Sequence, residues 1–178
     1  MHQAERMTLT RNRFVVRPID PDIVTQLLER DDAGRSPRIV VDDEGGSPLR
    51  CCLRVSRPGE QIALVSYAPL RRWARARHVD PGAYDEVGPI FVHTEPCAGA
   101  IDHEYPSEFR GSKRMLRAYS CDGRILGATF VEANGAFDQA LDEMLSDPDV
   151  AVVHARAVEF GCFTFEVRRP RALDQSKS

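Results

Sequence analysis

The sequence lacks long hydrophobic runs, an apolar leader and any general excess of basic residues. No apolar segment approaches the ~18 residues that a membrane-spanning helix needs, so we expect no membrane partner. Residues 1–12 are polar and of mixed charge, which is unlike a secretory signal and predicts a cytoplasmic protein. The net charge is −3 and the only lysines are Lys113 and Lys177. We therefore expect no nucleic-acid partner.

Familiar catalytic and metal-binding motifs are absent as well. The sequence has no GxGxxG, GxxxxGK[ST], GxSxG or HExxH pattern, which excludes the simplest nucleotide-binding, serine-hydrolase and metalloprotease interpretations. Its 5 cysteines form no CxxC pair, so neither a zinc ribbon nor a thioredoxin-type motif is predicted. An odd number of cysteines without an export signal also argues against a disulfide framework.

The segments that are present predict one α+β domain over residues 13–168, between polar tails (1–12 and 169–178) that we expect to be flexible. Short β-branched or alternating segments, separated by glycine and proline, predict about eight strands in a mainly antiparallel sheet. Two principal helices are expected. One begins at Asp20-Pro21, an acidic cap followed by proline. The other runs from Asn134 to Asp147, where apolar residues repeat at helical spacing.

One predicted strand carries the main functional hypothesis. Residues 50–55 have the character of a strand, and alternation would place Arg50, Cys52 and Arg54 on one face. Arg117, on another predicted strand, is expected on the same polar face. Two guanidinium groups so placed would hold a carboxylate or phosphate, which arginine binds bidentately. The alternative is a solvated sheet surface with scattered ion pairs.

The segment 88–97 is the most informative part of the sequence. A Gly-Pro turn leads into a short apolar strand that ends at His93, and Cys97 follows four positions later. The pair has three interpretations: a thiol activated by an imidazole, two ligands of a metal site, or structural residues of a strand end and its loop. A third metal ligand would come from His154, Cys52 or Cys162.

Four blocks of sequence resemble a known family. They are residues 48–54 running into Pro58-Gly59-Glu60; Gly-Pro-Ile-Phe-Val-His with Pro96-Cys97; residues 105–125 with Asp122-Gly123; and Gly161-Cys162. From about Pro48 to Val167 the chain resembles the bacterial Domain of Unknown Function 1203 (DUF1203) family. That name implies no activity. The resemblance implies a small bacterial cytoplasmic protein and directs attention to Arg50, Cys52, Arg54, His93 and Cys97.

We therefore expect the protein to bind, with or without turnover, a small anionic metabolite in a pocket lined by arginine, histidine and cysteine. The predicted ligand-binding residues are Arg50, Cys52, Arg54 and Arg117. The predicted catalytic residues are His93, as proton donor or acceptor, and Cys97. Two alternatives are a non-catalytic protein-interaction or structural module, and a metal-dependent enzyme with His/Cys ligands. The sequence specifies no cofactor, substrate or oligomeric state.

Overall fold

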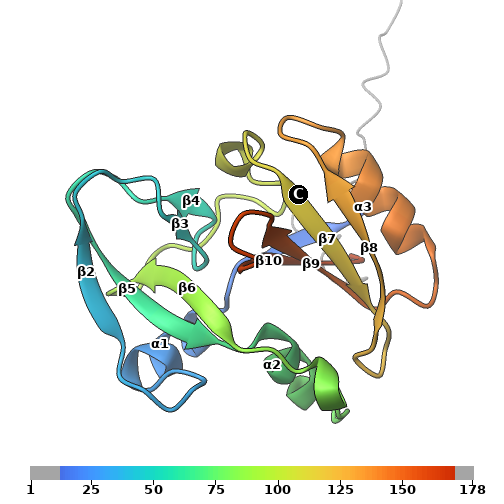
Figure 1. Ribbon diagram of the computed structural model, residues 1–178, viewed down its shortest axis with the longest axis horizontal. Coiled ribbons are helices and arrows are strands. Elements are labelled where there is room, and N and C mark those ends of the chain that lie inside the picture. The colour runs from blue at the N-terminus through green and yellow to red at the C-terminus, as the bar shows by residue number, and fades with distance from the viewer. Residues whose placement is uncertain (1–12, 171–178) are drawn as a thin grey trace, which may run out of the picture.

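Two five-stranded sheets organise residues 13–170, the part of the chain that the computed structural model describes (Figure 1). The predicted tail of residues 1–12, and residues 171–178 of the second tail, lie outside this range. The elements in chain order are β1 (Val15–Arg17), α1 (Pro21–Glu29), β2 (Arg38–Asp42), β3 (Pro48–Leu49), β4 (Arg54–Val55), β5 (Glu60–Tyr67), α2 (Pro69–Ala76), β6 (Gly88–His93), β7 (Arg114–Tyr119), β8 (Ile125–Val131), α3 (Phe137–Ser146), β9 (Val152–Ala157) and β10 (Phe163–Arg168). Single turns of 3-10 helix occupy Gly82–Tyr84 and Ser107–Phe109.

Sheet A has the strand order β1-β10-β9-β7-β8 and is antiparallel throughout. Helix α3 packs on one of its faces and closes a buried apolar core. Central members of that core are Leu116, Phe137, Leu141, Val153 and Phe165. The Asp122-Gly123 turn joins β7 to β8 as the sequence predicts, with Gly123 at a φ of 82°, where glycine meets no steric penalty.

Sheet B has the order β2-β5-β6-β3-β4 and contains one parallel pair, β3 with β6. Helix α1 covers it, and its buried residues Val24 and Leu27 belong to the second core. The helix begins as predicted, since Pro21 is its first residue and the Asp20 carboxylate accepts a hydrogen bond from the amide of Asp22 at 3.0 Å. Both cores belong to one α+β domain, but the strands form two sheets where a single sheet was the simpler expectation.

The helices differ from the prediction in two places. Helix α2 is a third helix, in addition to the two principal helices that the sequence predicts. It is eight residues long, begins at Pro69 and buries Leu70, Trp73 and Ala74 at helical spacing, while Arg71 and Arg75 are exposed. Helix α3 begins at Phe137, three residues later than predicted, because Asn134 adopts a φ of 56° that a helix cannot include.

The prediction of one strand over residues 50–55 is wrong. β3 and β4 contain only two residues each, and residues 50–53 form the tight turn between them. The amide of Leu53 donates to the carbonyl oxygen of Leu49 at 2.9 Å, and Leu53 has a φ of 59°. Side chains in a turn do not alternate between two faces, so the shared face proposed for Arg50, Cys52 and Arg54 does not exist.

Candidate functional site: a cluster of three cysteines and one histidine

Three cysteines and one histidine meet at one end of sheet B. Cys51 and Cys52 lie in the turn between β3 and β4. His93 is the last residue of β6, and Cys97 lies in the loop that follows. Because β3 runs parallel to β6 as its neighbour, the turn after β3 lies beside the end of β6. One ligand atom from each residue, three sulfurs and a ring nitrogen, lies within 4.8 Å of the others. We call these four residues the Cys–His cluster.

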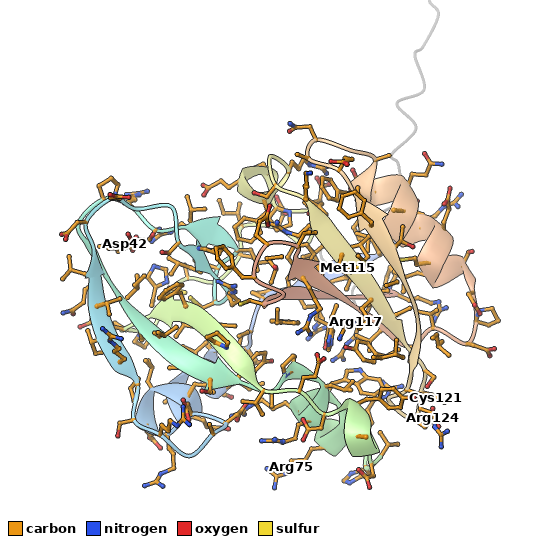
Figure 2. The ribbon with its side chains drawn as sticks, in the orientation of Figure 1. Asp42, Arg75, Met115, Arg117, Cys121 and Arg124 are labelled. Atoms are coloured by element: carbon orange, nitrogen blue, oxygen red, sulfur yellow. The ribbon has the colours of Figure 1, made fainter. Side chains whose placement is uncertain are left out.

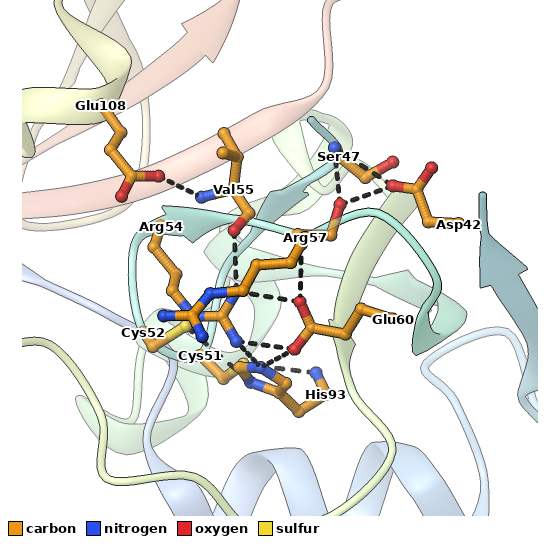
Figure 3. Close-up of polar contacts among 11 residues, drawn as sticks. Asp42, Ser47, Cys51, Cys52, Arg54, Val55, Arg57, Glu60, His93 and Glu108 are labelled. Atoms are coloured by element: carbon orange, nitrogen blue, oxygen red, sulfur yellow. Dashed lines mark hydrogen bonds and ion pairs between the residues drawn. The ribbon is translucent and has the colours of Figure 1, made fainter. Parts of the chain in front are cut away.

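The imidazole of His93 faces both adjacent thiols. Its Nδ1 atom is 3.2 Å from Sγ of Cys51 and 3.8 Å from Sγ of Cys52 (Figure 3). The backbone amide of His93 also donates to Sγ of Cys51 at 3.3 Å. Cys51 is only 3% exposed, whereas the other three members are half-buried. The ring nitrogen is thus directed at sulfur.

The second nitrogen of His93 meets an ion pair (Figure 3). Its Nε2 atom is 3.0 Å from Oε1 of Glu60 and 2.7 Å from a guanidinium nitrogen of Arg54. Arg54 donates to both carboxylate oxygens of Glu60, at 2.6 and 2.9 Å, and the amide of Arg57 adds a bond of 2.8 Å. The Arg54 hydrogen bond is the main cause that lowers the pKa of Glu60 to about 2. The Glu60 carboxylate, held by Arg54, therefore contacts the imidazole on the side opposite the thiols.

The two adjacent thiols differ in acidity. The hydrogen bond from the Cys51 thiol, helped by the Arg54 amide and the charges of His93 and Arg54, lowers the pKa of Cys52 to about 6. The same hydrogen bond and burial raise the pKa of Cys51. This shift favours the thiolate form of Cys52, the form in which cysteine binds metal ions and attacks electrophiles.

An apolar cavity of about 210 Å³ adjoins the cluster on the side of α1. Cys51 and Cys97 line it together with Val24 and Leu28. Sulfur atoms that border such a surface are shielded from bulk water, which strengthens their electrostatic interaction with a bound cation.

The structure brings four of the six predicted site residues together, namely Cys52, Arg54, His93 and Cys97. The other two lie elsewhere. Arg50 is 4% exposed and turns toward sheet A, where its Nε donates to the carbonyl of Phe163 at 2.9 Å, and its NH1 donates to the carbonyl of Pro48. Burial lowers the pKa of Arg50 to about 10, so it remains charged at neutral pH.

Arg117 lies on β7 of sheet A (Figure 2). Its guanidinium pairs with Glu86 at 3.0 Å. Since Arg50 and Arg54 are also engaged by backbone carbonyls and by Glu60, the geometry gives no support to an anion site built from these arginines. Of the three residues named as a third metal ligand, Cys52 joins the cluster, whereas His154 is fully buried on β9 and Cys162 lies outside the group.

Sequence reasoning missed Cys51 and Glu60. A strand over residues 50–55 would place Cys51 and Cys52 on opposite faces, so the strand prediction does not bring both thiols to His93. The adjacent cysteines themselves were the available signal, since a tight turn can direct neighbouring side chains to one point. Glu60 stands in the Pro-Gly-Glu block of the family resemblance, but no local pattern indicates that it reaches His93.

Fold and cluster together define an α+β protein with a thiol–imidazole centre at the end of a mixed sheet. The sequence profile of the family described as Protein of unknown function (DUF1203) matches residues 46–169, so the chain belongs to that family, as the resemblance predicted. No curated protein and no solved structure matches the chain. Within residues 13–170, no helix is long and apolar enough to cross a membrane.

Proposed function

We propose that the protein binds one zinc ion through Cys51, Cys52, His93 and Cys97. The observation that carries this proposal is the convergence of three sulfur atoms and one imidazole nitrogen within 4.8 Å. Three thiolates with one imidazole form a donor set that is common in structural zinc sites. Soft sulfur and nitrogen donors favour zinc over magnesium or calcium, which prefer oxygen ligands.

The separations fit a tetrahedral ion. Bonds of about 2.3 Å to sulfur and about 2.0–2.1 Å to nitrogen place the two ligand atoms about 3.6 Å apart across a tetrahedral edge. The observed distances from Nδ1 of His93 to the sulfurs of Cys51 and Cys52, 3.2 and 3.8 Å, lie on either side of this value. Small shifts of the turn and loop are enough to complete the site.

The contact between His93 and Glu60 supports the same assignment. When Nε2 carries the proton it donates to Glu60, and the lone pair of Nδ1 then points toward the sulfurs. A histidine that binds zinc characteristically donates its other N–H to a carboxylate or carbonyl group, which fixes the tautomer and the ring orientation. Arg54 holds that carboxylate in place.

Four protein ligands leave no open position on a tetrahedral ion, so the proposed zinc is structural. The ligands belong to the β3–β4 turn, to the end of β6 and to the loop at Cys97. Two of these segments have little regular structure of their own, and the ion ties them to a central strand of sheet B. The zinc therefore stabilises sheet B. Because the unfolded chain has no preformed site, the free energy of zinc binding adds to the free energy of folding.

Zinc content tests the proposal directly. Protein purified under reducing conditions without chelators should contain about one zinc per chain by elemental analysis and native mass spectrometry. Cys52→Ser, Cys97→Ser and His93→Gln should each lose zinc, whereas Cys121→Ser, a change at an exposed thiol outside the cluster, should not. Protein with less than about 0.1 zinc per chain that also fails to take up added zinc would contradict the proposal. Rapid oxidation of its thiols by peroxide would then favour the thiol–imidazole interpretation.

We also propose that the protein works in a reducing compartment, the bacterial cytoplasm, without a nucleic-acid or membrane partner. Support for the reducing compartment comes from the cysteines, since Cys51, Cys52, Cys97, Cys121 and Cys162 are all free.

A further inference from the structure

A second cavity, separate from the Cys–His cluster, lies where the two sheets meet. It has a volume of about 380 Å³ and is bounded by β1 and β10 of sheet A, by the end of β5, and by helices α1 and α2. Small-molecule sites typically measure about 300–1,000 Å³. None of the four cluster residues lines this cavity, so what it binds is independent of the proposed zinc.

A row of polar side chains crosses sheet A and ends at this cavity. In the strand register, Glu166 on β10 lies opposite Arg17 on β1 and opposite His154 on β9. His154 in turn lies opposite Arg117 on β7. Residues directly opposite each other in antiparallel strands share a face, so these four side chains lie on one face of the sheet. The apolar core under α3 occupies the other face. Arg17 and Glu166, at one end of the row, line the cavity.

Most charged groups around the cavity are already compensated. Nε of Arg168 lies 2.5 Å from a carboxylate oxygen of Glu166, so these two charges cancel. A guanidinium nitrogen of Arg72 is 2.7 Å from the carboxylate of Asp32, which cancels a second positive charge. Asp20 accepts the first-turn amide of α1 and faces the positive end of that helix.

Arg17 is different, since its half-buried guanidinium lines the cavity but has no hydrogen-bond or ion-pair partner within residues 13–170. Tyr67, which is 7% exposed, contributes a hydroxyl group that also lacks a hydrogen-bond partner in that range. Apolar side chains form another part of the wall. The Tyr67 ring packs against Phe163 at a centroid distance of 5.4 Å, and Ile19 and Ile23 line the side of α1.

We propose that this cavity binds a small organic monocarboxylate with an apolar body. The carboxylate pairs with the guanidinium of Arg17 and receives a hydrogen bond from the hydroxyl of Tyr67. The apolar part lies against Phe163, Ile19 and Ile23. A singly charged ligand matches the single uncompensated guanidinium, whereas a phosphate dianion would leave one negative charge without a partner in the cavity. The anionic ligand expected from the sequence thus fits this cavity better than the turn at Arg50.

The single tryptophan of the chain, Trp73, lines the cavity and provides the readout. Zinc-containing protein is titrated with 4-phenylbutyrate and with its neutral analogue 4-phenylbutyramide while Trp73 fluorescence is followed. We expect saturable binding, with the carboxylate at least about tenfold tighter than the amide. Arg17→Gln should weaken 4-phenylbutyrate about tenfold or more and Arg17→Lys less, because lysine keeps the charge but loses the bidentate geometry. Arg38→Gln, on the exposed edge strand β2, is the matched control and should bind as the wild type does.

The zinc content and near-ultraviolet circular dichroism of Arg17→Gln establish that the variant is folded, so a loss of binding there supports the proposal. Three results would overturn it: no saturation by 4-phenylbutyrate up to ~10 mM in the wild type, equal affinity for acid and amide, or unchanged affinity in a folded Arg17→Gln. None of them bears on zinc, whose ligands are other residues.

Discussion

The Nε2 atom of His93 lies 3.0 Å from Oε1 of Glu60, on the opposite side of the imidazole from the sulfur atoms. With the proton on Nε2, this contact is a hydrogen bond to Glu60 and leaves the lone pair of Nδ1 directed at the cluster. Glu60 is therefore expected to influence zinc binding although it is not a ligand. Its position depends on Arg54, which binds both of its oxygens.

Replacing Glu60 by glutamine should weaken zinc binding by about tenfold, within the 10–100-fold range found for residues that orient a ligand. Glutamine still accepts a hydrogen bond, but it carries no charge to support the imidazole. Competition with a chromophoric chelator measures the affinity. Glu44→Gln, at an exposed position outside the cluster, serves as the control. An unchanged affinity for Glu60→Gln would show that the carboxylate does not orient His93.

Removing zinc should loosen one part of the molecule selectively. Amide hydrogen exchange is expected to increase in the β3–β4 turn and in residues 94–97, because the proposed ion links Cys51, Cys52 and Cys97 to His93 on β6. The β7–β8 hairpin in sheet A should keep its protection, since it lies in the other sheet and packs under α3. Mass-spectrometric exchange with and without chelator measures both regions. Equal deprotection of the two would argue against a local structural role.

Asp31 should give the fold an acid-sensitive contribution. Burial acts to raise its pKa, but hydrogen bonds from the amides of Arg35, Ser66 and Ala33, at 2.8, 2.9 and 3.0 Å, outweigh burial and lower it. Because the folded pKa is the lower one, this stabilisation is complete above about pH 4 and is lost as the pH falls through the folded pKa.

Asp31→Asn should therefore cost about 1–3 kcal/mol of unfolding free energy at pH 7, and the difference from the wild type should shrink toward pH 3. Denaturant titrations of both proteins at the two pH values measure this. Asp43→Asn, at an exposed position, should differ little from the wild type at either pH. A difference that grows on acidification would contradict the assigned sign.

Arg50 should contribute to the free energy of unfolding and not to ligand binding. Its buried guanidinium donates to the carbonyls of Pro48 and Phe163 and so links the β3–β4 turn to β10. Arg50→Ala leaves these buried acceptors without donors and should cost about 2–4 kcal/mol in unfolding free energy, against at most about 0.5 kcal/mol for the exposed Arg38→Ala. Binding of 4-phenylbutyrate to the folded fraction should not change. Loss of that binding without loss of stability would restore the sequence-based role of Arg50 in ligand binding.

Local signals in the sequence predicted local structure well. The cap at Asp20 and the turn at Asp122-Gly123 depend on neighbouring residues, and the structure confirms them. The turn at residues 50–53 was missed because two short strands with an intervening turn have the same apolar and β-branched character as one longer strand.

The site was only partly predictable for a related reason. Cys52, His93 and Cys97 were recognised from chemistry and spacing, but Cys51 and Glu60 reach His93 only through non-local pairing of β3 and β5 with β6. No pattern within a segment encodes that pairing. The division into two sheets also depends on non-local strand pairing. It places Arg117 in sheet A, whereas the cysteines of the cluster lie at sheet B.

X-ray absorption at the zinc K-edge tests the central claim most directly, because it reports the atoms bound to the metal in the intact protein. The account predicts about three sulfur neighbours at about 2.3 Å and one nitrogen at about 2.0–2.1 Å. In Cys97→Ser, one sulfur should be lost from that shell. A wild-type shell made only of oxygen and nitrogen would contradict the assignment of zinc to Cys51, Cys52, His93 and Cys97.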